Sequence, residues 1–274
     1  MGTDDTARSR ERSGGVVCAP DPLAVLTGRR GVSDFDPCYA SWSLLTTERL
    51  TVWTLYRHAK GNLYLGLGAA VHSETGDRHE RYLCLYDTPE VAWVRPAGMF
   101  HETLPTGERR FAAVARVRVV MPEDEPTVLA FGYDAWGEGR PLDAFLASYE
   151  QNRNHLRGTR YGLETLEGEL VANCNTLRFE RGIVGIASVA THPAHRGQGH
   201  AGRLLRAVMA LLREQDRDSR FLLFSEVEPA IYARVGFEVL PDAHQRFLPA
   251  IAMATGLSAR PLTPDEARWL ERYF

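Results

Sequence analysis

The sequence predicts an α/β (α+β) fold, a mixed and mostly antiparallel sheet with flanking helices, preceded by a small all-β module. Three observations lead to this prediction. Short strand-like runs separated by turn signals fill residues 50–95. Later, tight turns at Glu167-Gly168 and Arg181-Gly182 join three strands into an antiparallel meander. A β-α-β crossover follows only after the meander, at a glycine-containing turn near residue 197.

Hydrophobic periodicity defines the individual elements. Residues 111–121 alternate as in a half-buried strand, and residues 141–155 place apolar side chains on one helical face with Pro141 at N1. Thr263 and Glu266 form a capping box for a last helix. The predicted strands are 50–57, 62–71, 81–86, 91–95, 111–121, 161–166, 169–179, 183–191, 221–227, 237–240 and 245–252, and the other predicted helices are 127–136, 141–155, 200–214 and 229–235.

Composition limits the class of protein. The 274 residues are 44% hydrophobic and 24% charged, which suits a globular protein of one or two domains. A formal net charge of −3 gives no general attraction to nucleic acid or to an acidic membrane. No apolar run approaches a membrane span and the first twenty residues lack a leader-like apolar stretch, so a cytoplasmic location is expected. The four cysteines are far apart, which predicts neither a disulfide framework nor a metal site.

Four segments are predicted along the chain. Residues 1–20 are polar and are expected to be a disordered tail, and residues 21–49 have no assignable pattern. Residues 50–108 are expected to form the small all-β module, called the N-terminal module below. Residues 109–274 are expected to form the second domain.

The most informative stretch is the turn between residues 191 and 200. An apolar strand ends, Gly197 and Gly199 follow with one residue between them, and an amphipathic helix begins. Such a turn gathers backbone N–H groups at a helix N-terminus, where they can hold a pyrophosphate.

One interpretation of this turn is the dinucleotide fingerprint G-x-G-x-x-G, formed by Gly197, Gly199 and Gly202, with Glu226 near the position of a ribose-binding acid. That fingerprint usually opens its domain and follows its strand directly, whereas here T-H-P-A-H-R intervenes and the turn lies late in the chain. Too few residues follow Glu226 for a doubly wound sheet, so this interpretation is not favoured.

The other interpretation rests on three motifs. R-G-Q-G-H-A at 196–201 resembles the R/Q-x-x-G-x-G/A signature of the GCN5-related N-acetyltransferases (GNAT). The preceding S-V-A-T-H-P is similar to the fourth strand of that family, and Y-A-R-V-G-F at 232–237 resembles its Y-x-x-x-G-F segment. The resemblance covers about residues 110–274 and implies a GNAT-like sheet with splayed central strands.

The resemblance implies acetyl-CoA as the acyl donor. It places Val189, Ala190 and Thr191 along the pantetheine, and the pyrophosphate against a loop made of Arg196, Gly197, Gln198, Gly199, His200 and Ala201. Tyr232 is placed by its motif to protonate the leaving sulfur, since a phenol can act as a general acid.

The general base is left open by the residues themselves. Glu226 follows the strand after the cofactor helix and could be the base or an acid that binds the amine. Glu164 on the first meander strand is a second candidate, with a solvated edge charge as its alternative, and a water relay is a third. Cys174 is expected to be a buried small hydrophobic residue rather than a nucleophile.

The N-terminal module resembles a short bacterial domain of unknown function. The motifs are Y-R-H-A-K-G-N-L-Y at 56–64, H-S-E-T-G at 72–76 and W-V-R-P-A-G-M-F at 93–100. Its aromatic residues indicate a compact barrel or a curled sheet. They are expected to form a core, with a recognition surface as the alternative.

The sequence therefore predicts an N-acyltransferase that moves acetyl from acetyl-CoA to a small-molecule amine by direct attack in a ternary complex. One alternative is acylation of a protein or RNA acceptor docked by the N-terminal module. Another is a non-catalytic acyl-CoA sensor or an acyl-thioester decarboxylase. A homodimer, paired through a C-terminal strand or through the module, is an open expectation.

Overall fold

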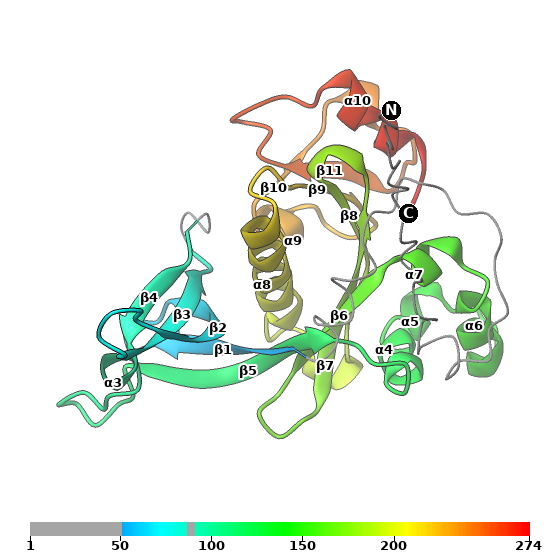
Figure 1. Ribbon diagram of the computed structural model, residues 1–274. Helices are drawn as coiled ribbons and strands as arrows, with labels where there is room; N and C mark the ends of the chain where they lie inside the picture. The colour runs from blue at the N-terminus through cyan, green and yellow to red at the C-terminus, as the bar shows by residue number, and fades with distance from the viewer. Residues whose placement is uncertain (1–50, 87–90) are drawn as a thin grey trace, which may run out of the picture. The chain divides into compact units, whose positions relative to one another are not determined.

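The computed structural model describes residues 51–86 and 91–274 (Figure 1). The predicted tail at 1–20 and the unassigned segment at 21–49 lie outside these residues. The described strands form one sheet in the order β10-β11-β9-β8-β7-β6-β5-β1-β2-β3-β4. Every pairing is antiparallel except that of β8 with β9, which confirms the predicted mixed, mostly antiparallel sheet.

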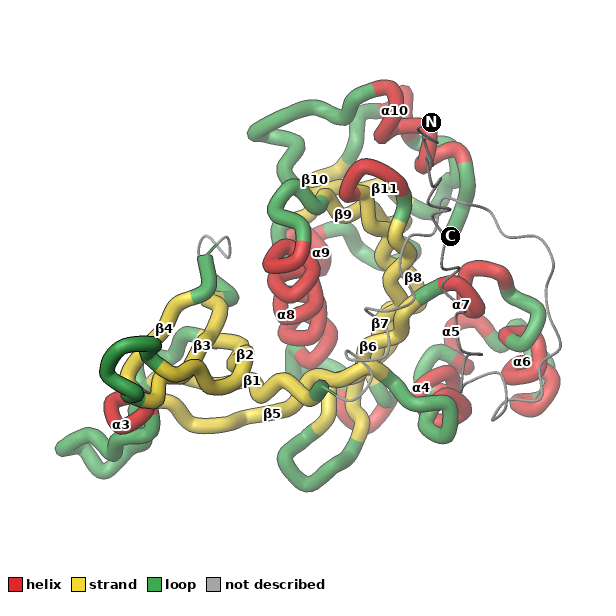
Figure 2. The backbone as a smooth tube through the Cα atoms, in the orientation of Figure 1, coloured by secondary structure: helices red, strands yellow, loops and turns green. Residues whose placement is uncertain are grey.

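The sheet continues without a gap from β10 to β4, and helices pack against it (Figure 2). The strands are β1(Val52–His58), β2(Leu63–Val71), β3(Arg78–Cys84), β4(Trp93–Pro96), β5(Phe111–Val119), β6(Thr159–Glu164), β7(Leu170–Arg178), β8(Ile183–Thr191), β9(Arg220–Ser225), β10(Phe237–Val239) and β11(Ile251–Thr255). The α-helices are α3(Ala97–Phe100), α4(Glu125–Ala130), α5(Tyr133–Trp136), α6(Leu142–Tyr149), α7(Arg153–Arg157), α8(His200–Gln215), α9(Ala230–Ala233) and α10(Pro264–Ala267).

Strand β7 shows how the two faces of the sheet are covered. Successive side chains of a strand point to opposite faces. Cys174 is fully buried in the cluster that includes α8, whereas the neighbouring Asn173 donates from its amide to the Val128 carbonyl of α4 at 2.9 Å. Asn175 donates to the Asn154 carbonyl of α7 at 3.1 Å. Helix α8 therefore covers one face and the α4–α7 segment covers the other.

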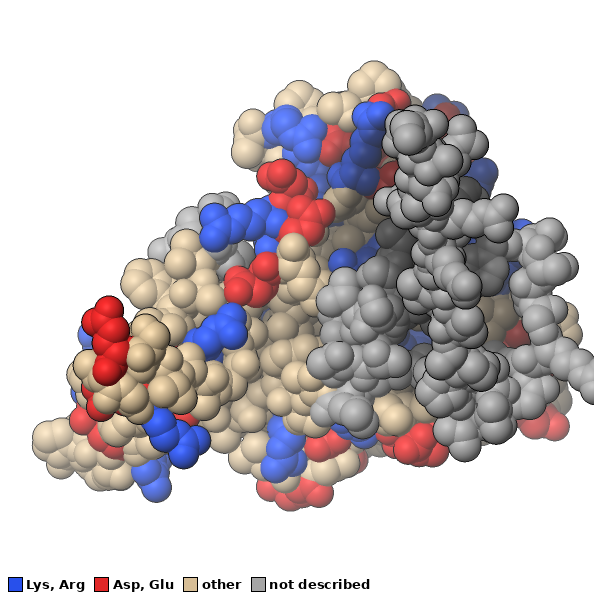
Figure 3. All heavy atoms as spheres, viewed as in Figure 1, with Lys and Arg blue, Asp and Glu red and all other residues tan. Residues whose placement is uncertain are grey.

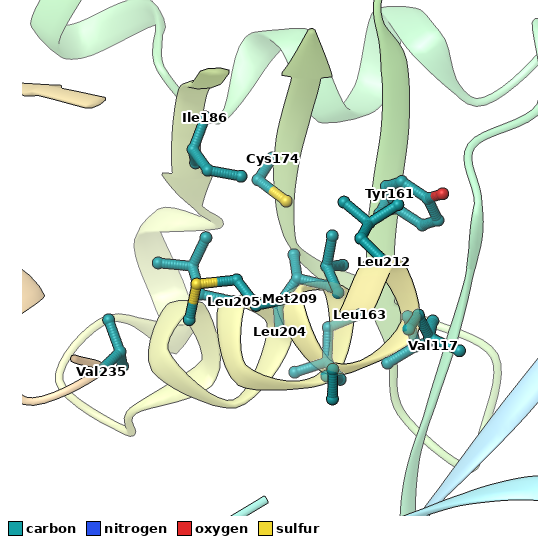
Figure 4. Packing of buried hydrophobic residues seen from close by; sticks show 14 of the residues in the cluster. Val117, Tyr161, Leu163, Cys174, Ile186, Leu204, Leu205, Met209, Leu212 and Val235 are labelled. Atoms are coloured by element: carbon teal, nitrogen blue, oxygen red, sulfur yellow. The ribbon is translucent and has the colours of Figure 1, made fainter. Parts of the chain in front are cut away.

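The largest core lies between α8 and the sheet (Figure 4). Leu204 and Leu212 of α8 are fully buried, and Leu205 and Met209 lie toward Ile186 and Cys174 of the sheet. The prediction that this helix is anchored by one apolar face is confirmed. Cys174 is fully buried in this cluster, which confirms the prediction for this cysteine, and burial raises the pKa of its thiol to about 12.

The N-terminal module is a curled sheet rather than a closed barrel. Strand β4 pairs with β3 alone among the described residues, so the module is open at β4. Phe100 of α3 stacks on Phe111 of β5, with ring centroids 4.2 Å apart, and Tyr82 packs on both rings. Tyr82 thus lies in an aromatic core, as predicted, whereas Tyr86 and Trp93, which the prediction also placed in the core, are about half exposed.

The module and the second domain share the sheet. Strand β5, which we assigned to the second domain, pairs with β1 on one side and with β6 on the other. Trp53 and Leu55 of β1 belong to the same buried cluster as α8. The domain boundary at 108/109 stays a prediction.

Two predicted helices are each divided in the structure. The helix at 127–136 is two helices, α4 and α5, because Gly132 interrupts it and the Trp136 ring occupies the space a Cβ would need. The helix at 141–155 is also divided, since Asn152 caps the new helix α7 by accepting from the amides of Asn154 and His155. In addition, Pro141 is the N-cap of α6 rather than its N1 residue.

The strand predicted at 245–252 begins later, as β11(Ile251–Thr255). A 3-10 turn at Asp242–His244 precedes it, and the Gln245 side chain binds the backbone of Leu240 and Ala252, which holds the intervening segment off the sheet. No helix in the part of the chain that the structure describes is long and apolar enough to cross a membrane.

Candidate active site

Strands β8 and β9 part in the middle of the sheet. Their parallel pairing covers only Ile183↔Arg220, Val184↔Phe221 and Gly185↔Leu222. Beyond Gly185, β8 continues to Thr191 along β7, and β9 continues to Ser225 along β11. The splay that the family resemblance implied is present, and Val189, Ala190 and Thr191 lie on the diverging part of β8.

A β-bulge lies in the diverging part of β8. The register with β7 shifts between Asn173 and Asn175, so that β8 contains one extra residue there. Ser188 adopts the left-handed φ of 48° at this point. Bulges are common beside active sites because they redirect backbone groups and side chains, and this one lies immediately before the predicted pantetheine residues.

The turn after β8 is built to expose backbone amides. Gly197 and Gly199 have φ of 78° and 77°, in the left-handed region where residues with a Cβ are strained. Helix α8 begins directly after Gly199, with the positive end of its dipole at the turn. Among the described residues, the amides of residues 197–201 have no hydrogen-bond acceptor. The turn can therefore accept an anion without breaking an existing bond.

The Arg196 side chain holds this turn in place. Its guanidinium binds both carboxylate oxygens of Asp134 in α5, at 2.5 and 2.9 Å. It also donates to the Phe131 carbonyl at 2.9 Å and to the Thr191 carbonyl at 3.2 Å. The hydrogen bond to Arg196 lowers the pKa of Asp134. We therefore assign the side chain to positioning the loop, while its backbone remains in the predicted cofactor-binding segment.

The other polar side chains of the turn interact with one another. His200 and Gln198 are joined at 3.3 Å, and burial lowers the pKa of His200. His195 binds Glu169 at 3.0 Å, and His192 accepts from the Ala194 amide. Potential ligand atoms of Glu169, His192 and His195 lie within 4.8 Å of one another, so the prediction of no metal site stays a prediction.

Tyr232 lies on α9, close to the buried cluster of α8. Its ring packs on Phe237 with centroids 6.1 Å apart. Its hydroxyl makes no hydrogen bond within the described part of the chain. Burial, together with the charges of Cys174 and Glu226, raises its pKa to about 12. The hydroxyl is therefore protonated at neutral pH and has no described partner.

Glu226 follows β9 and is held by two aromatic donors. The Trp136 indole of α5 donates to one carboxylate oxygen at 2.8 Å, and the Tyr273 hydroxyl donates to the other. The Tyr273 ring stacks on Phe224 at 5.0 Å and contacts Phe247 at 5.5 Å. Sequence reasoning did not find these aromatic partners, and no motif connects residues 136, 226 and 273.

Glu164 is occupied elsewhere. Its carboxylate binds Arg118 at 2.6 Å and lies 3.4 Å from Arg116, its cross-strand neighbour on β5. Arg118 also binds Asp124 at 2.7 Å. The charge of Glu164 therefore serves an ion-pair network on β5 and β6, and the structure does not join it to Tyr232 or Glu226 by any described contact. This agrees with the alternative of an edge charge, and the role of Glu164 as a general base stays a prediction.

Comparison with known families agrees with this geometry. Residues 54–113 match a family described as protein of unknown function (DUF1653), and residues 116–240 match the acetyltransferase (GNAT) domain family. The segment that matches this model, residues 116–240, is called the GNAT domain below.

Individual relatives of the GNAT domain are distant. The chain is 30% identical over 184 residues to a protein named mycothiol acetyltransferase from Streptomyces bingchenggensis, a match that covers 60% of this chain and 56% of that protein. The chain thus spans little more than half the length of this curated relative.

Solved structures with a similar fold are more distant in sequence. A GNAT family N-acetyltransferase from Escherichia coli in complex with CoA is 21% identical, with 60% of this chain and 89% of that chain covered and a TM-score of 0.43. A chimera of spermidine N-acetyltransferase from Vibrio cholerae and hSSAT is 15% identical, with 52% of this chain and 95% of that chain covered and a TM-score of 0.41.

The matched GNAT domain contains the splay, the turn and Tyr232, but not all of the Glu226 environment. Tyr273 lies beyond the matched residues. Helix α5 connects the glycine turn with the surroundings of Glu226. Its Asp134 binds Arg196 of the turn, and its Trp136 donates to Glu226.

Proposed function

We propose that this chain is an N-acetyltransferase that transfers acetyl from acetyl-CoA to the amine of a small molecule, by direct attack in a ternary complex. The observation that carries the proposal is the splay of β8 and β9 beside a turn of amides that have no described acceptor. A linear thioester with a pyrophosphate in its middle fits this arrangement. The pyrophosphate binds at the turn while the acyl end extends along β8.

The donor side uses backbone groups. The amides of residues 197–201 and the dipole of α8 bind the pyrophosphate, and the pantetheine follows Val189, Ala190 and Thr191. Backbone N–H groups of the diverging β8 polarise the thioester carbonyl, since preorganised donors stabilise the oxyanion as it forms. Arg196 contributes by keeping the turn in the shape that these contacts need.

The chemical step follows from these positions. The lone pair of a neutral amine attacks the carbonyl carbon, and the carbonyl electrons move to oxygen. When they return, the C–S bond breaks, and the sulfur takes a proton from the Tyr232 hydroxyl. The amine nitrogen loses one proton to Glu226 or to water. A pKa of about 12 makes Tyr232 a weak acid. The burial that raises this pKa also disfavours the charged thiolate of the leaving group, so transfer of the proton to sulfur remains favourable.

The acceptor side is assigned to Glu226 and the aromatic rings around it. A carboxylate held by Trp136 and Tyr273 attracts an ammonium group, and aromatic faces nearby add cation–π attraction. Glu226 first accepts one proton from the bound ammonium and passes it to solvent, which leaves a neutral amine as the nucleophile and the carboxylate free for the second proton. The similarity to a protein named mycothiol acetyltransferase supports a small-molecule acceptor.

The test is to incubate the full chain with acetyl-CoA and a panel of amines, measuring free thiol and acetylated product by mass spectrometry. Thiol release that depends on an amine supports transfer. Binding of acetyl-CoA without turnover for any amine would support the sensor instead, and carbon dioxide release from malonyl-CoA would support the decarboxylase. Absence of any acetyl-CoA binding in a thermal-shift measurement would refute the proposal.

Two variants divide the roles within the site. Tyr232→Phe should lower kcat by about 100-fold or more, the usual effect of losing a general acid, without changing the Kd of acetyl-CoA. Glu226→Gln should raise the KM of the amine, because the carboxylate charge is lost. Tyr56→Phe, on module strand β1, is the matched control and should leave both constants unchanged. An unchanged kcat for Tyr232→Phe would remove the acid role.

A further inference from the structure

A cleft of about 510 Å³ lies between the N-terminal module and α8. The module side is formed by Asn62, Leu63 and Tyr86, and the other side by Arg206, Arg234 and Val235. This volume falls within the range of small-molecule sites. Residues of both the module and the GNAT domain line this cleft, so a ligand bound in it would contact both.

The cleft begins where the cofactor turn ends. Gly202 lies in the first turn of α8, directly after the amides assigned to the pyrophosphate. A Cβ placed on Gly202 would lie 3.5 Å from Val235 Cγ1 and 3.6 Å from Arg206 Nη1, and both of these residues line the cleft. A ligand held at the turn can therefore continue past Gly202 into the cleft.

The chemistry of acyl-CoA requires such a continuation. The pyrophosphate joins two parts, the pantetheine on one side and adenosine 3′-phosphate on the other. If the pantetheine extends along β8 toward the splay, the nucleotide leaves the turn in another direction. Gly202 lies in the first turn of α8 and Arg206 in the second, so this part of the helix leads from the turn toward the cleft.

The charge of the cleft suits a phosphate. Three arginines line it, Arg206, Arg213 and Arg234, and no acidic residue does within the described part of the chain. Arg206 is held in place by donating to the Arg234 carbonyl. Arg57 of module strand β1 adds positive charge near the start of α8. Burial and this charge together lower the pKa of Arg203. Elsewhere, the face in Figure 3 has basic and acidic side chains interspersed.

The module provides a surface for the base. Tyr86 lines the cleft and is 52% exposed. Its orientation is fixed, because its hydroxyl lies 2.9 Å from that of Tyr64 and the two rings pack edge to face at 5.5 Å. A preset aromatic face of this kind stacks on nucleic-acid bases.

We propose that the N-terminal module forms one wall of the site for the nucleotide end of acyl-CoA, with Tyr86 stacking on the adenine and Arg206 and Arg234 binding the 3′-phosphate. The inference rests on the proposed function, because it takes acyl-CoA as the ligand of the turn. It gives the module a part in donor binding rather than in acceptor recognition.

The experiment compares the binding of CoA and of 3′-dephospho-CoA to the full chain by calorimetry. The unsubstituted protein should bind CoA at least about 10-fold more tightly, since charge-assisted hydrogen bonds to the 3′-phosphate are lost with 3′-dephospho-CoA. Arg206→Ala and Arg234→Ala should each reduce this preference, and Arg206→Lys should retain most of it. Tyr86→Ala should weaken both ligands by about 5- to 100-fold without changing their ratio.

Arg217→Ala is the matched control, because Arg217 lies beyond the C-terminal end of α8 and lines a different cleft, together with Asp218 and Arg260. It should leave both affinities unchanged. Thermal unfolding of each variant shows whether it is folded. Equal affinity for the two ligands, together with an unchanged affinity in Tyr86→Ala, would overturn this inference and leave the proposed function standing. Failure of both ligands to bind the unsubstituted protein would overturn both.

Discussion

The carboxylate of Glu266 is expected to be one of the strongest electrostatic contributors to stability in the described residues. It lies at N3 of α10, is 6% exposed, and accepts two bonds from Arg260 at 2.7 and 2.9 Å and one from the Thr263 amide at 2.7 Å. Arg220 lies 3.7 Å away. Burial alone would raise the pKa of Glu266, but these partners more than offset it and lower the pKa from 4.5 to about 2.

The magnitude follows from linkage. A folded pKa about 2.5 units below the unfolded value corresponds to about 3 kcal/mol of stability at neutral pH, at about 1.4 kcal/mol per unit. Because the folded pKa is the lower one, this contribution is complete above pH 4.5 and is lost as the pH falls toward 2. Glu266→Gln keeps the shape and the acceptor oxygen of the capping box while it removes the charge.

The assay is urea unfolding followed by tryptophan fluorescence at pH 7 and pH 3. Glu266→Gln should lower the free energy of unfolding by about 3 kcal/mol at pH 7 and by less than half of that at pH 3. The control is Leu212→Ala, at a fully buried apolar position of α8, which removes no charge and should lower the free energy of unfolding by the same amount at both pH values. A loss for Glu266→Gln that is equal at the two pH values would refute this reasoning, because it would not depend on the charge.

Three further predictions concern the core and the turn. Leu212→Ala, at a fully buried position of α8, should lower the free energy of unfolding by about 2–5 kcal/mol in the same assay. Gly199→Ala should weaken acetyl-CoA binding measured by calorimetry, because the left-handed φ of 77° is strained for alanine, whereas Gly98→Ala has open space and an ordinary φ and should have no effect. Asp134→Asn should also weaken acetyl-CoA binding, since it releases Arg196. In the unsubstituted protein this ion pair should weaken as the pH falls below about 3.8, because the folded pKa of Asp134 is lowered.

Local signals predicted much of the fold. Arg181 and Gly182 both have positive φ, as the predicted tight hairpin turn requires, and the capping box at Thr263 forms as expected. The apolar periodicity of residues 200–214 predicted α8 almost to its ends. The splay of β8 and β9 came from the family resemblance rather than from periodicity, since nothing local marks where two strands separate.

The errors arose where distant residues decide local structure. The helix break lies at Gly132, where the Trp136 ring occupies the space that a Cβ would need, and helix propensities do not describe such a contact. The ion pairs of Glu164 also depend on strand pairing, since Arg116 and Arg118 lie almost fifty residues earlier, and its role as a base stays a prediction. The aromatic environment of Glu226 could not be predicted, because it joins α5 to the C-terminal segment.

Strand β5 has a consequence for how the chain can be divided. It carries hydrogen bonds to β1 on one edge and to β6 on the other, and the buried cluster crosses it without interruption. A chain shortened to start at residue 109 would leave one edge of β5 without its partner and expose the apolar side chains that Trp53 and Leu55 now cover. Such an edge favours pairing with other chains, so removing the module should produce aggregation rather than a smaller working enzyme. The module and the GNAT domain are accordingly expected to unfold in a single transition.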